Sequence, residues 1–327
     1  MSNVALTYWQ AGIESTKGTP VAATRKTYTI GGIPKETRNK EHISQARQNF
    51  IANFDAVETH AIVDGFTLEL PGSPFTDLPF WFQSGIKGAV TPTGAGPYVW
   101  TFNDAATSDD LDAYTLEVND GVGSFETPYT MVKSWEMSGK GGSGPSLVNF
   151  KMELMAQKLT AGITMTAAIS DRDLRGQYMP FKNTQLFMDS TAGNIGTTGV
   201  AAALEEFTIK VDNGLEPRFT GSASGGYYTT HRRAERYCEF TAILLFNSTT
   251  YSEFSTSFQA NAGRFIQLKN TGAGNNLFTF NLYTKPETFE FNEDGAARRV
   301  AIMGRSIYDT TLGYSFRAVV QKVVSAL

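Results

Sequence analysis

Three histidines and one cysteine are the side chains of this 327-residue chain best suited to bind a metal or to act as nucleophiles. No two of His42, His60 and His231 stand at the spacing of zinc ligands, and Cys238 lies alone in an apolar run. A lone cysteine of this kind is usually a small buried side chain, and it has no partner for a disulfide within the chain. We therefore expect no metal site and no cofactor.

A glycine-rich segment, Gly139–Gly144, has the spacing GxGxxG, which cradles a phosphate when it joins a strand to a helix. Here the alternating segment Ser134–Ser138 precedes it, and a second strand-like segment, Leu147–Leu159, follows it. We therefore predict a hairpin loop and no nucleotide site.

Neighbouring carboxylates could supply the acid and the base of a glycosidase. The pairs Asp109–Asp110, Glu205–Glu206 and Glu293–Asp294 lie in turn-like or strand-edge sequence, where solvated acids are common. The chain also lacks the GxSxG elbow of serine hydrolases. We predict that the protein is not an enzyme.

The composition indicates a folded β protein with no affinity for nucleic acid. Hydrophobic residues make up 41% of the chain, aromatic residues 12% and charged residues 18%, which is typical of a globular protein rich in strands. The formal net charge of -4 gives no basic surface for binding phosphates. The sequence also contains neither a run of 18 apolar residues nor a signal-peptide pattern at Met1–Trp9, so we expect no membrane helix and no secretion.

Short segments of alternating apolar and polar residues predict half-buried strands, among them Phe66–Leu70, Tyr114–Val118 and Phe207–Val211. Turn sequences at Asn119–Gly121, Asp212–Gly214 and Glu293–Gly295 separate such segments, because Asn, Asp and Gly tolerate a positive φ.

Two stretches predict short amphipathic helices. Phe75–Gly85 carries Phe75, Leu78 and Phe82 at positions i, i+3 and i+7, with Pro79 where a first-turn proline is tolerated. The second stretch is Tyr251–Asn261, with Tyr251, Phe254 and Phe258 at the same spacing. We expect these six side chains to pack the helices onto the core.

The order of the predicted elements indicates an internal duplication. The two helices match each other position by position, and each follows an apolar strand. Leu6–Trp9 and Tyr28–Ile30 correspond to Gln185–Met188 and Phe207–Ile209, and Met152–Leu159 parallels Phe316–Val323. We predict one β–α–β unit over residues 1–165, a connector over 166–183 and a second unit over 184–327.

Two charged stretches occupy equivalent places in these units, ahead of each strand–helix pair. One runs from residue 35 to 58 and the other from 218 to 236. We predict that they are arms that contact other subunits; solvated loops are the alternative. Their candidate contact residues are Arg38, Lys40, Glu41, Arg47, Arg218, Arg232 and Arg233.

The segment Glu14-Ser-Thr-Lys-Gly-Thr-Pro-Val21 resembles the opening of many phage tail tube proteins. The strand–helix unit Gly65–Gly88 and the later strand Leu147–Leu159 resemble core elements of the same family. The resemblance covers most of the chain and rests on the order of the motifs.

This resemblance implies a structural subunit of the virion tail, assembled in the bacterial cytoplasm. The expected fold is mainly β, with two tandem tail-tube-like β-sandwich or half-barrel domains, each with one short flanking helix. Subunits would form rings whose sheets join into a barrel, and the rings would stack into a tube. DNA would pass through during ejection without specific binding.

Family members typically carry one such domain and form hexamers. Two domains in one chain therefore favour a ring of three, with a ring of six as the alternative. The resemblance also implies contacts with tape-measure and with tail terminator or baseplate proteins. We predict that deleting Asn39–Phe54 leaves a folded subunit that no longer polymerises.

Other functions remain open at this point. One is a glycan- or receptor-binding or decoration protein of a virion, and another is the tube protein of a bacterial contractile injection system. Exposed aromatic clusters and glycan binding without polymerisation would favour the first; gene neighbourhood would separate the second.

Overall fold

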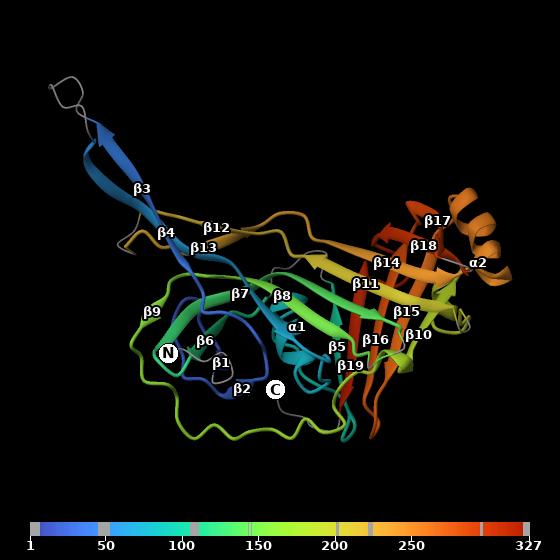
Figure 1. The fold of residues 1–327 in the computed structure, drawn as a ribbon, viewed down its shortest axis with the longest axis horizontal. Helices are drawn as coiled ribbons and strands as arrows, with labels where there is room; N and C mark the ends of the chain where they lie inside the picture. Colours follow the sequence, from blue (N-terminus) through green and yellow to red (C-terminus); the bar gives the residue numbers. More distant parts are fainter. Residues whose placement is uncertain are drawn as a thin grey trace.

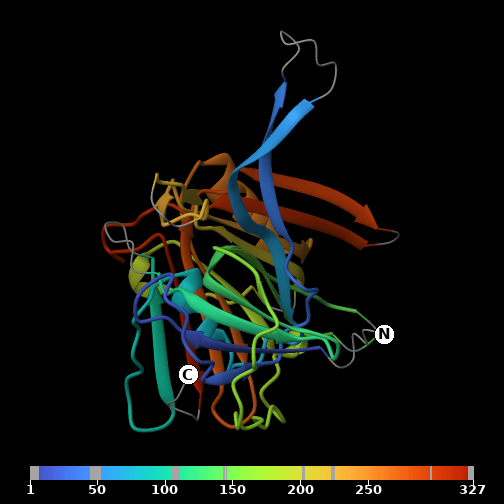
Figure 2. The ribbon, with the colours of Figure 1, turned by 90° about the vertical axis from the view of Figure 1, so that its left-hand side faces the viewer.

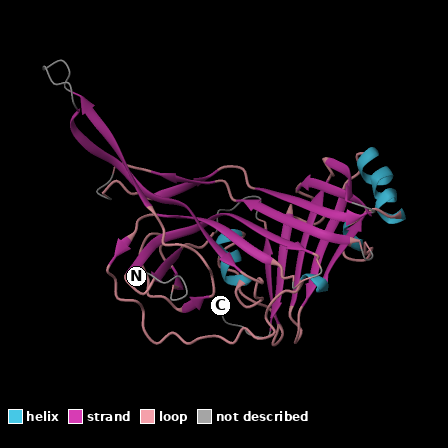
Figure 3. Cartoon of the chain, viewed as in Figure 1, coloured by secondary structure: helices cyan, strands magenta, loops and turns pink. Residues whose placement is uncertain are grey.

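The computed structural model describes residues 7–44, 53–104, 111–142, 144, 146–200, 203–221, 225–294 and 297–322. Strands dominate these residues (Figure 3). The strands are β1 (Tyr8–Ile13), β2 (Arg25–Thr27), β3 (Glu36–Ser44), β4 (Asn53–Leu70), β5 (Tyr98–Asn103), β6 (Tyr114–Asn119), β7 (Ser124–Lys140), β8 (Asn149–Ala156), β9 (Thr160–Ala161), β10 (Thr184–Asp189), β11 (Leu204–Asp212), β12 (Leu215–Arg218), β13 (Thr230–Arg233), β14 (Tyr237–Leu245), β15 (Arg264–Thr271), β16 (Leu277–Thr284), β17 (Thr288–Asp294), β18 (Ala297–Arg305) and β19 (Phe316–Lys322). The helices are α1 (Leu78–Gly85), α2 (Ser248–Glu253), the π-helix η5 (Phe254–Gln259) and the 3-10 turns η3 (Phe181–Asn183) and η4 (Ala192–Asn194).

The strands form a 12-stranded sheet, a 5-stranded sheet in the order β10-β15-β16-β19-β5 and the two-stranded hairpin β12–β13 (Figure 1). Side chains from both large sheets meet in one apolar cluster. On the larger sheet β11 points Phe207, Ile209 and Val211 into it, and on the smaller sheet β16 contributes Phe278 and Phe280. The prediction of a mainly β, sandwich-like fold is confirmed.

Eight strands of the larger sheet follow one another in the order β3-β4-β8-β7-β11-β14-β18-β17, and every neighbouring pair is antiparallel. The first four come from the N-terminal half of the chain and the last four from the C-terminal half. In each set the first two strands pair as a long hairpin (β3–β4, β11–β14). The third strand (β8, β18) comes later in the chain, and the fourth (β7, β17) is its hairpin partner. We call these sets the first and second four-strand units.

The two halves share sheets and core. β7 pairs with β11 across the predicted connector, and β5 of the N-terminal half extends the 5-stranded sheet at β19. One sequence match does not describe equivalent positions, because β8 lies in the larger sheet and β19 in the smaller one. By position in the sheet, the counterpart of β8 is β18. The domain boundaries at 165 and 184 stay a prediction.

Both predicted helices exist, with corrected limits. α1 spans Leu78–Gly85, with Pro79 in its first turn as predicted. α2 begins at Ser248, three residues earlier than Tyr251, because the Asn247 side chain accepts bonds from the backbone N–H groups of the first turn. The second helix continues as η5 and ends at Gln259, before the predicted Asn261.

The carboxylate of Glu14 explains the turn-rich segment that follows β1. It accepts bonds from the backbone N–H of Gly18 at 2.6 Å, the backbone N–H of Tyr129 at 2.7 Å and the hydroxyl of Thr115 at 2.9 Å. Gly18 has a φ of +84°, which favours glycine. Burial raises the pKa of Glu14, although the three bonds oppose that shift. The Glu-to-Gly spacing noted in the sequence therefore closes one turn and ties it to β6 and β7.

The connector between the two halves is fixed to the N-terminal half. The Arg172 backbone N–H donates to the Tyr28 hydroxyl at 2.7 Å, and its guanidinium donates to the Lys26 carbonyl at 2.9 Å. The same guanidinium forms an ion pair with Asp77, which stands just before α1. Figure 1 shows this segment as the long loop that runs from β9 towards β10.

Asp77 lies in a buried cluster with more positive than negative charge. It pairs with Arg25 at 2.6 Å, and both side chains are buried. Lys322 is only 1% exposed, with its ammonium 5.2 Å from the Trp100 ring centre. Burial lowers the pKa of Lys322 to about 7 and that of Arg25 to about 10.

Candidate assembly surface

The side of the eight-strand sheet that faces away from the core is a polar surface, which we call the open face. It follows from strand alternation, because successive side chains of a strand point to opposite sides. On β11, for example, Thr208 and Lys210 point away from the core that Phe207 and Ile209 enter. The 5-stranded sheet therefore packs against only one side of this sheet.

A row of six charged residues crosses the open face, with one residue on each of six neighbouring strands. Strand register places each of them directly beside the next, and the sign of the charge alternates at every step. We call this set the charge row; in spatial order it is Glu69, Lys151, Glu136, Lys210, Glu239 and Arg305. Two of its ion pairs close at 3.6 Å (Lys151–Glu69) and 2.9 Å (Arg305–Glu239). Opposite charges in facing positions stabilise neighbouring strands and sum to zero over the row.

A second row runs parallel to the charge row and consists of uncharged residues, all of them polar except Met303. It consists of Asn149, Ser138, Thr208, Thr241, Met303 and Thr288. The open face therefore offers charge that is locally balanced next to hydroxyl and amide groups. These two rows therefore concentrate no positive charge that would hold a polyanion.

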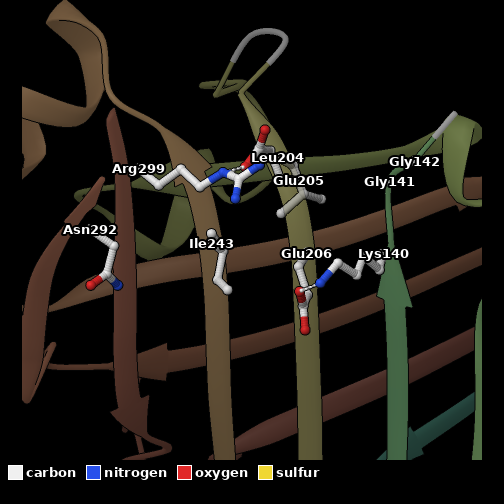
Figure 4. Close-up of a pocket in the computed structure, with 9 residues that line it drawn as sticks. All are labelled: Lys140, Gly141, Gly142, Leu204, Glu205, Glu206, Ile243, Asn292 and Arg299. Carbon is white, nitrogen blue, oxygen red and sulfur yellow. Dashed lines mark ion pairs between the residues drawn. The ribbon is translucent and has the colours of Figure 1, made fainter. Parts of the chain in front are cut away.

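A shallow pocket of about 560 Å³ lies at one end of the open face, over β7, β11, β14, β18 and β17 (Figure 4). Lys140 pairs there with Glu206 at 3.0 Å, and Arg299 pairs with Glu205. Both pairs join neighbouring or nearby strands of the sheet, so they extend the pattern of balanced charge. None of the described residues that line the pocket is a serine, a cysteine or a histidine.

The open face ends in two edge strands. Among the described residues, β3 pairs only with β4, and β17 pairs only with β18. An unpaired strand edge exposes backbone N–H and C=O groups that can bind another strand. The edges lie far apart in Figure 1, with β3 on the long projecting hairpin and β17 at the opposite end.

The predicted arms are two hairpins that lie side by side. β3–β4 projects from the body (Figure 2), and β12–β13 contacts its base through a backbone bond from Ala61 N–H to the Gly226 carbonyl at 3.0 Å. The rings of His60 and Phe219 also meet, with their centres 4.6 Å apart. The structure therefore brings together two segments that are far apart in the sequence.

The candidate contact residues are distributed over these two hairpins. Arg38, Lys40 and Glu41 lie exposed on β3, Arg218 lies exposed at the end of β12, and Arg232 and Arg233 lie on β13. Arg38 is paired within the chain with Glu36 at 2.8 Å and Glu58 at 3.5 Å, and Arg232 is paired with Glu216. Arg47 lies outside the described residues. The role of these residues in subunit contacts stays a prediction.

The helix residues chosen from the sequence behave differently in the two helices. Phe75, Leu78 and Phe82 are completely buried, and Phe82 contacts Trp135 and Phe150. Phe254 and Phe258 are half-buried and pack against the edge of the core. Tyr251 is 59% exposed, so it does not pack the second helix onto the core as expected.

The described side chains that could bind a metal or act as nucleophiles do not form a cluster. The described part of the chain contains no group of three or more His, Cys, Asp or Glu side chains placed to hold a metal ion. Cys238 is buried, and burial raises the pKa of its thiol well above the usual value, which disfavours the nucleophilic thiolate. Lys140 ends β7 and Asn149 begins β8, so the glycine-rich segment joins two strands as predicted. In the described residues we also find no helix with the length and apolar character needed to cross a bilayer.

Comparisons with family models and with curated proteins identify no relative. No model of a known protein family matches the chain. A search of curated proteins also finds no similar sequence.

Proposed function

We propose that this chain is a structural subunit that joins copies of itself into a ring around a channel, as in the tail tube of a long-tailed bacteriophage. Rings would stack into a tube, and DNA would pass through it without specific binding. In this role the chain has no catalytic activity and needs no cofactor.

One observation carries the proposal, which is the eight-strand antiparallel sheet with a polar face and, among the residues that the structure describes, two unpaired edges. Edges of this length expose backbone groups that a stable soluble sheet normally pairs or covers. Closure of several such sheets into a barrel removes every edge. The antiparallel order supports closure, because an even number of strands per chain keeps neighbours antiparallel at each junction between copies.

The charges of the open face support its assignment to the channel wall. The charge row is balanced, and the row beside it is uncharged and almost entirely polar. A wall with a concentration of lysine and arginine would bind the phosphates of passing DNA and slow it. A balanced wall stays hydrated and lets a polyanion slide.

The repeated four-strand unit favours three chains per ring. Three chains would contribute six four-strand units, which gives a ring with approximate sixfold symmetry. Six chains per ring are the alternative. The hairpin β3–β4 is suited to contact the neighbouring ring, since it extends beyond the body of the subunit (Figures 1 and 2), and β12–β13 lies beside its base.

Electron microscopy of the purified protein at rising concentration tests the proposal. We expect rings or tubes with a central pore, and threefold symmetry in end-on averages. A variant that lacks Asn39–Phe54 should retain the far-ultraviolet circular dichroism of the intact protein but form no tubes. A wild-type protein that stays monomeric at all concentrations and binds glycans would refute the ring and favour a virion glycan-binding protein.

A further inference from the structure

The chain already contains one junction between its two four-strand units. β7 of the first unit pairs with β11 of the second, from Lys140–Glu206 to Ser134–Asp212. This junction shows how the last strand of one unit binds the first strand of another. In the second unit β17 takes the place of β7, and in the first unit β3 takes the place of β11.

The two helices differ in a way that points to a missing neighbour. All eight residues of α1 are buried, and its C-terminal end is held by the second unit. Asn213 donates to the Gly85 carbonyl at 3.1 Å, and Arg236 donates to the Ile86 carbonyl at 2.9 Å. The corresponding helix in the second half buries only Thr250 in α2 and Ser257 in η5.

Aromatic side chains cluster at the same exposed end of the molecule. The rings of Phe246, Phe254 and Phe291 are in contact, with centres 5.5 Å apart for Phe246–Phe291 and 5.3 Å apart for Phe254–Phe291. Phe291 is 52% exposed and Tyr251 is 59% exposed. A group of exposed aromatic rings can also bind a glycan, but this one lies beside the β17 edge, and that combination is typical of a surface that another protein strand covers.

We propose that the β17 edge of one copy, together with α2 and η5, is covered by the β3 edge of a second copy, so that the junction between chains repeats the β7–β11 junction within the chain. This inference rests on the proposed ring. A second copy is the partner that fits this edge, because it supplies a β3 strand in the place that β11 takes beside β7 within the chain.

The register of the first unit provides the reference for this junction. In that unit, a row of paired residues starts at Leu70 on β4 and crosses Phe150 on β8 and Met137 on β7. Met137 then pairs with Ile209 of β11 across the junction. The strand pairings between chains follow once the counterparts of Met137 and Ile209 are known.

The counterpart of Met137 is Glu293. The second unit has the same kind of row, which starts at Phe246, the residue directly after β14. The Phe246 N–H donates to the Arg298 carbonyl at 2.9 Å. Arg298 pairs with Glu293 of β17.

The counterpart of Ile209 is Glu36. Ile209 pairs with Phe240, which is the fourth core-facing residue counted back along β14 from Phe246. On β4 the same count from Leu70 passes the irregularity at Asp64 and reaches Val63 as the fourth core-facing residue. Val63 pairs with Glu36 of β3.

The junction between chains therefore places Glu293 of one copy opposite Glu36 of the next, and Asn292 opposite Thr37. Asn292 and Thr37 are both exposed in the single chain. They are accessible positions for a covalent test of the register.

The test uses a double variant, Thr37→Cys with Asn292→Cys, under conditions in which electron microscopy shows rings. Native Cys238 is buried and does not interfere. After mild oxidation, a denaturing gel without reductant should show covalent dimers and trimers and no larger species if three chains close the ring. The matched control is Thr37→Cys with Glu290→Cys, two residues further along β17, and we expect it to crosslink at least tenfold less.

The outcomes separate the two proposals. Rings that form without crosslinks, or that crosslink equally well in the control pair, would overturn the proposed junction while the ring itself stands. The absence of rings in the wild-type protein would overturn the proposed function and this inference with it. Crosslinks confined to the Thr37–Asn292 pair would support the junction, and the largest covalent species would count the chains.

Discussion

Removal of one sign of charge from the charge row should convert the open face into a DNA-binding surface. The change is the triple variant Glu69→Gln, Glu136→Gln and Glu239→Gln, which leaves Lys151, Lys210 and Arg305 unbalanced. The substitutions preserve side-chain size, and exposed ion pairs contribute little to stability, so the fold should persist.

The expected magnitude follows from counterion release. Three cations that each contact a phosphate give a slope of about −2.7 in a plot of log affinity against log salt concentration. Between 50 and 200 mM salt the affinity should therefore fall roughly 40-fold. The wild-type protein, with a balanced row, should bind duplex DNA far more weakly at the lower salt concentration.

Fluorescence anisotropy of a labelled DNA duplex measures both quantities on the unassembled subunit. The matched control is Lys151→Gln, Lys210→Gln and Arg305→Gln, which changes the same charge row but leaves its carboxylates. This control should not bind the DNA. If the triple Glu variant bound no better than the wild-type protein, or bound without salt dependence, the charge row would not govern the interaction of this face with a polyanion.

Two further predictions concern the stability of the subunit. Glu14→Ala should lower the free energy of unfolding by about 1–3 kcal/mol, because it leaves the buried N–H of Tyr129 without its acceptor. Glu14→Gln retains a carbonyl oxygen and should lower it less. Equal losses of the two variants in chemical denaturation would argue against this account. The pKa of Lys322 is lowered by burial to about 7, so between pH 7 and about 10 the unfolded chain binds more protons than the folded chain, and stability should rise with pH in that window. The difference in stability between the wild type and Lys322→Met, measured by thermal unfolding, should therefore shrink as the pH rises, by up to about 1.4 kcal/mol per pH unit. A difference that does not change with pH would contradict the lowered pKa of Lys322.

Local features of the fold were predictable because they depend on short-range patterns. Alternation identified the strands at Phe66–Leu70 and Phe207–Val211, which lie within β4 and β11. The turn at Asn119–Gly121 has the expected positive φ at glycine, and the Asn119 side chain accepts a bond from the Gly121 N–H. The start of the second helix was wrong because the helical spacing of the aromatics was followed and the cap at Asn247 was overlooked.

The charge row could not have been found from the sequence, although each of its members was visible. Glu69, Lys210 and Glu239 each stand at a polar position of a recognisable strand. Their alternation appears only when the strands are placed in order and in register, and both depend on contacts between distant segments. A bulge between Asp64 and Phe66, for example, shifts the register of half of β4.

The association of the two halves was also out of reach, for the same reason. No pattern within β7 or β11 specifies the other as its partner, since both read as ordinary alternating strands. The match drawn between Met152–Leu159 and Phe316–Val323 followed similarity of residue type and missed that β8 and β19 lie in different sheets.

The β7–β11 junction has a consequence for the kinetics of assembly. A junction that forms inside one chain needs no collision between molecules, and the loss of translational and rotational freedom that opposes association, about 4–15 kcal/mol per event, does not arise there. In the proposed ring of three, half of the six junctions are of this kind. The rate of nucleation should then depend on about the third power of subunit concentration, whereas six single-unit chains would give a steeper dependence. Fusion of two units in one polypeptide thus favours the start of a tube at low protein concentration.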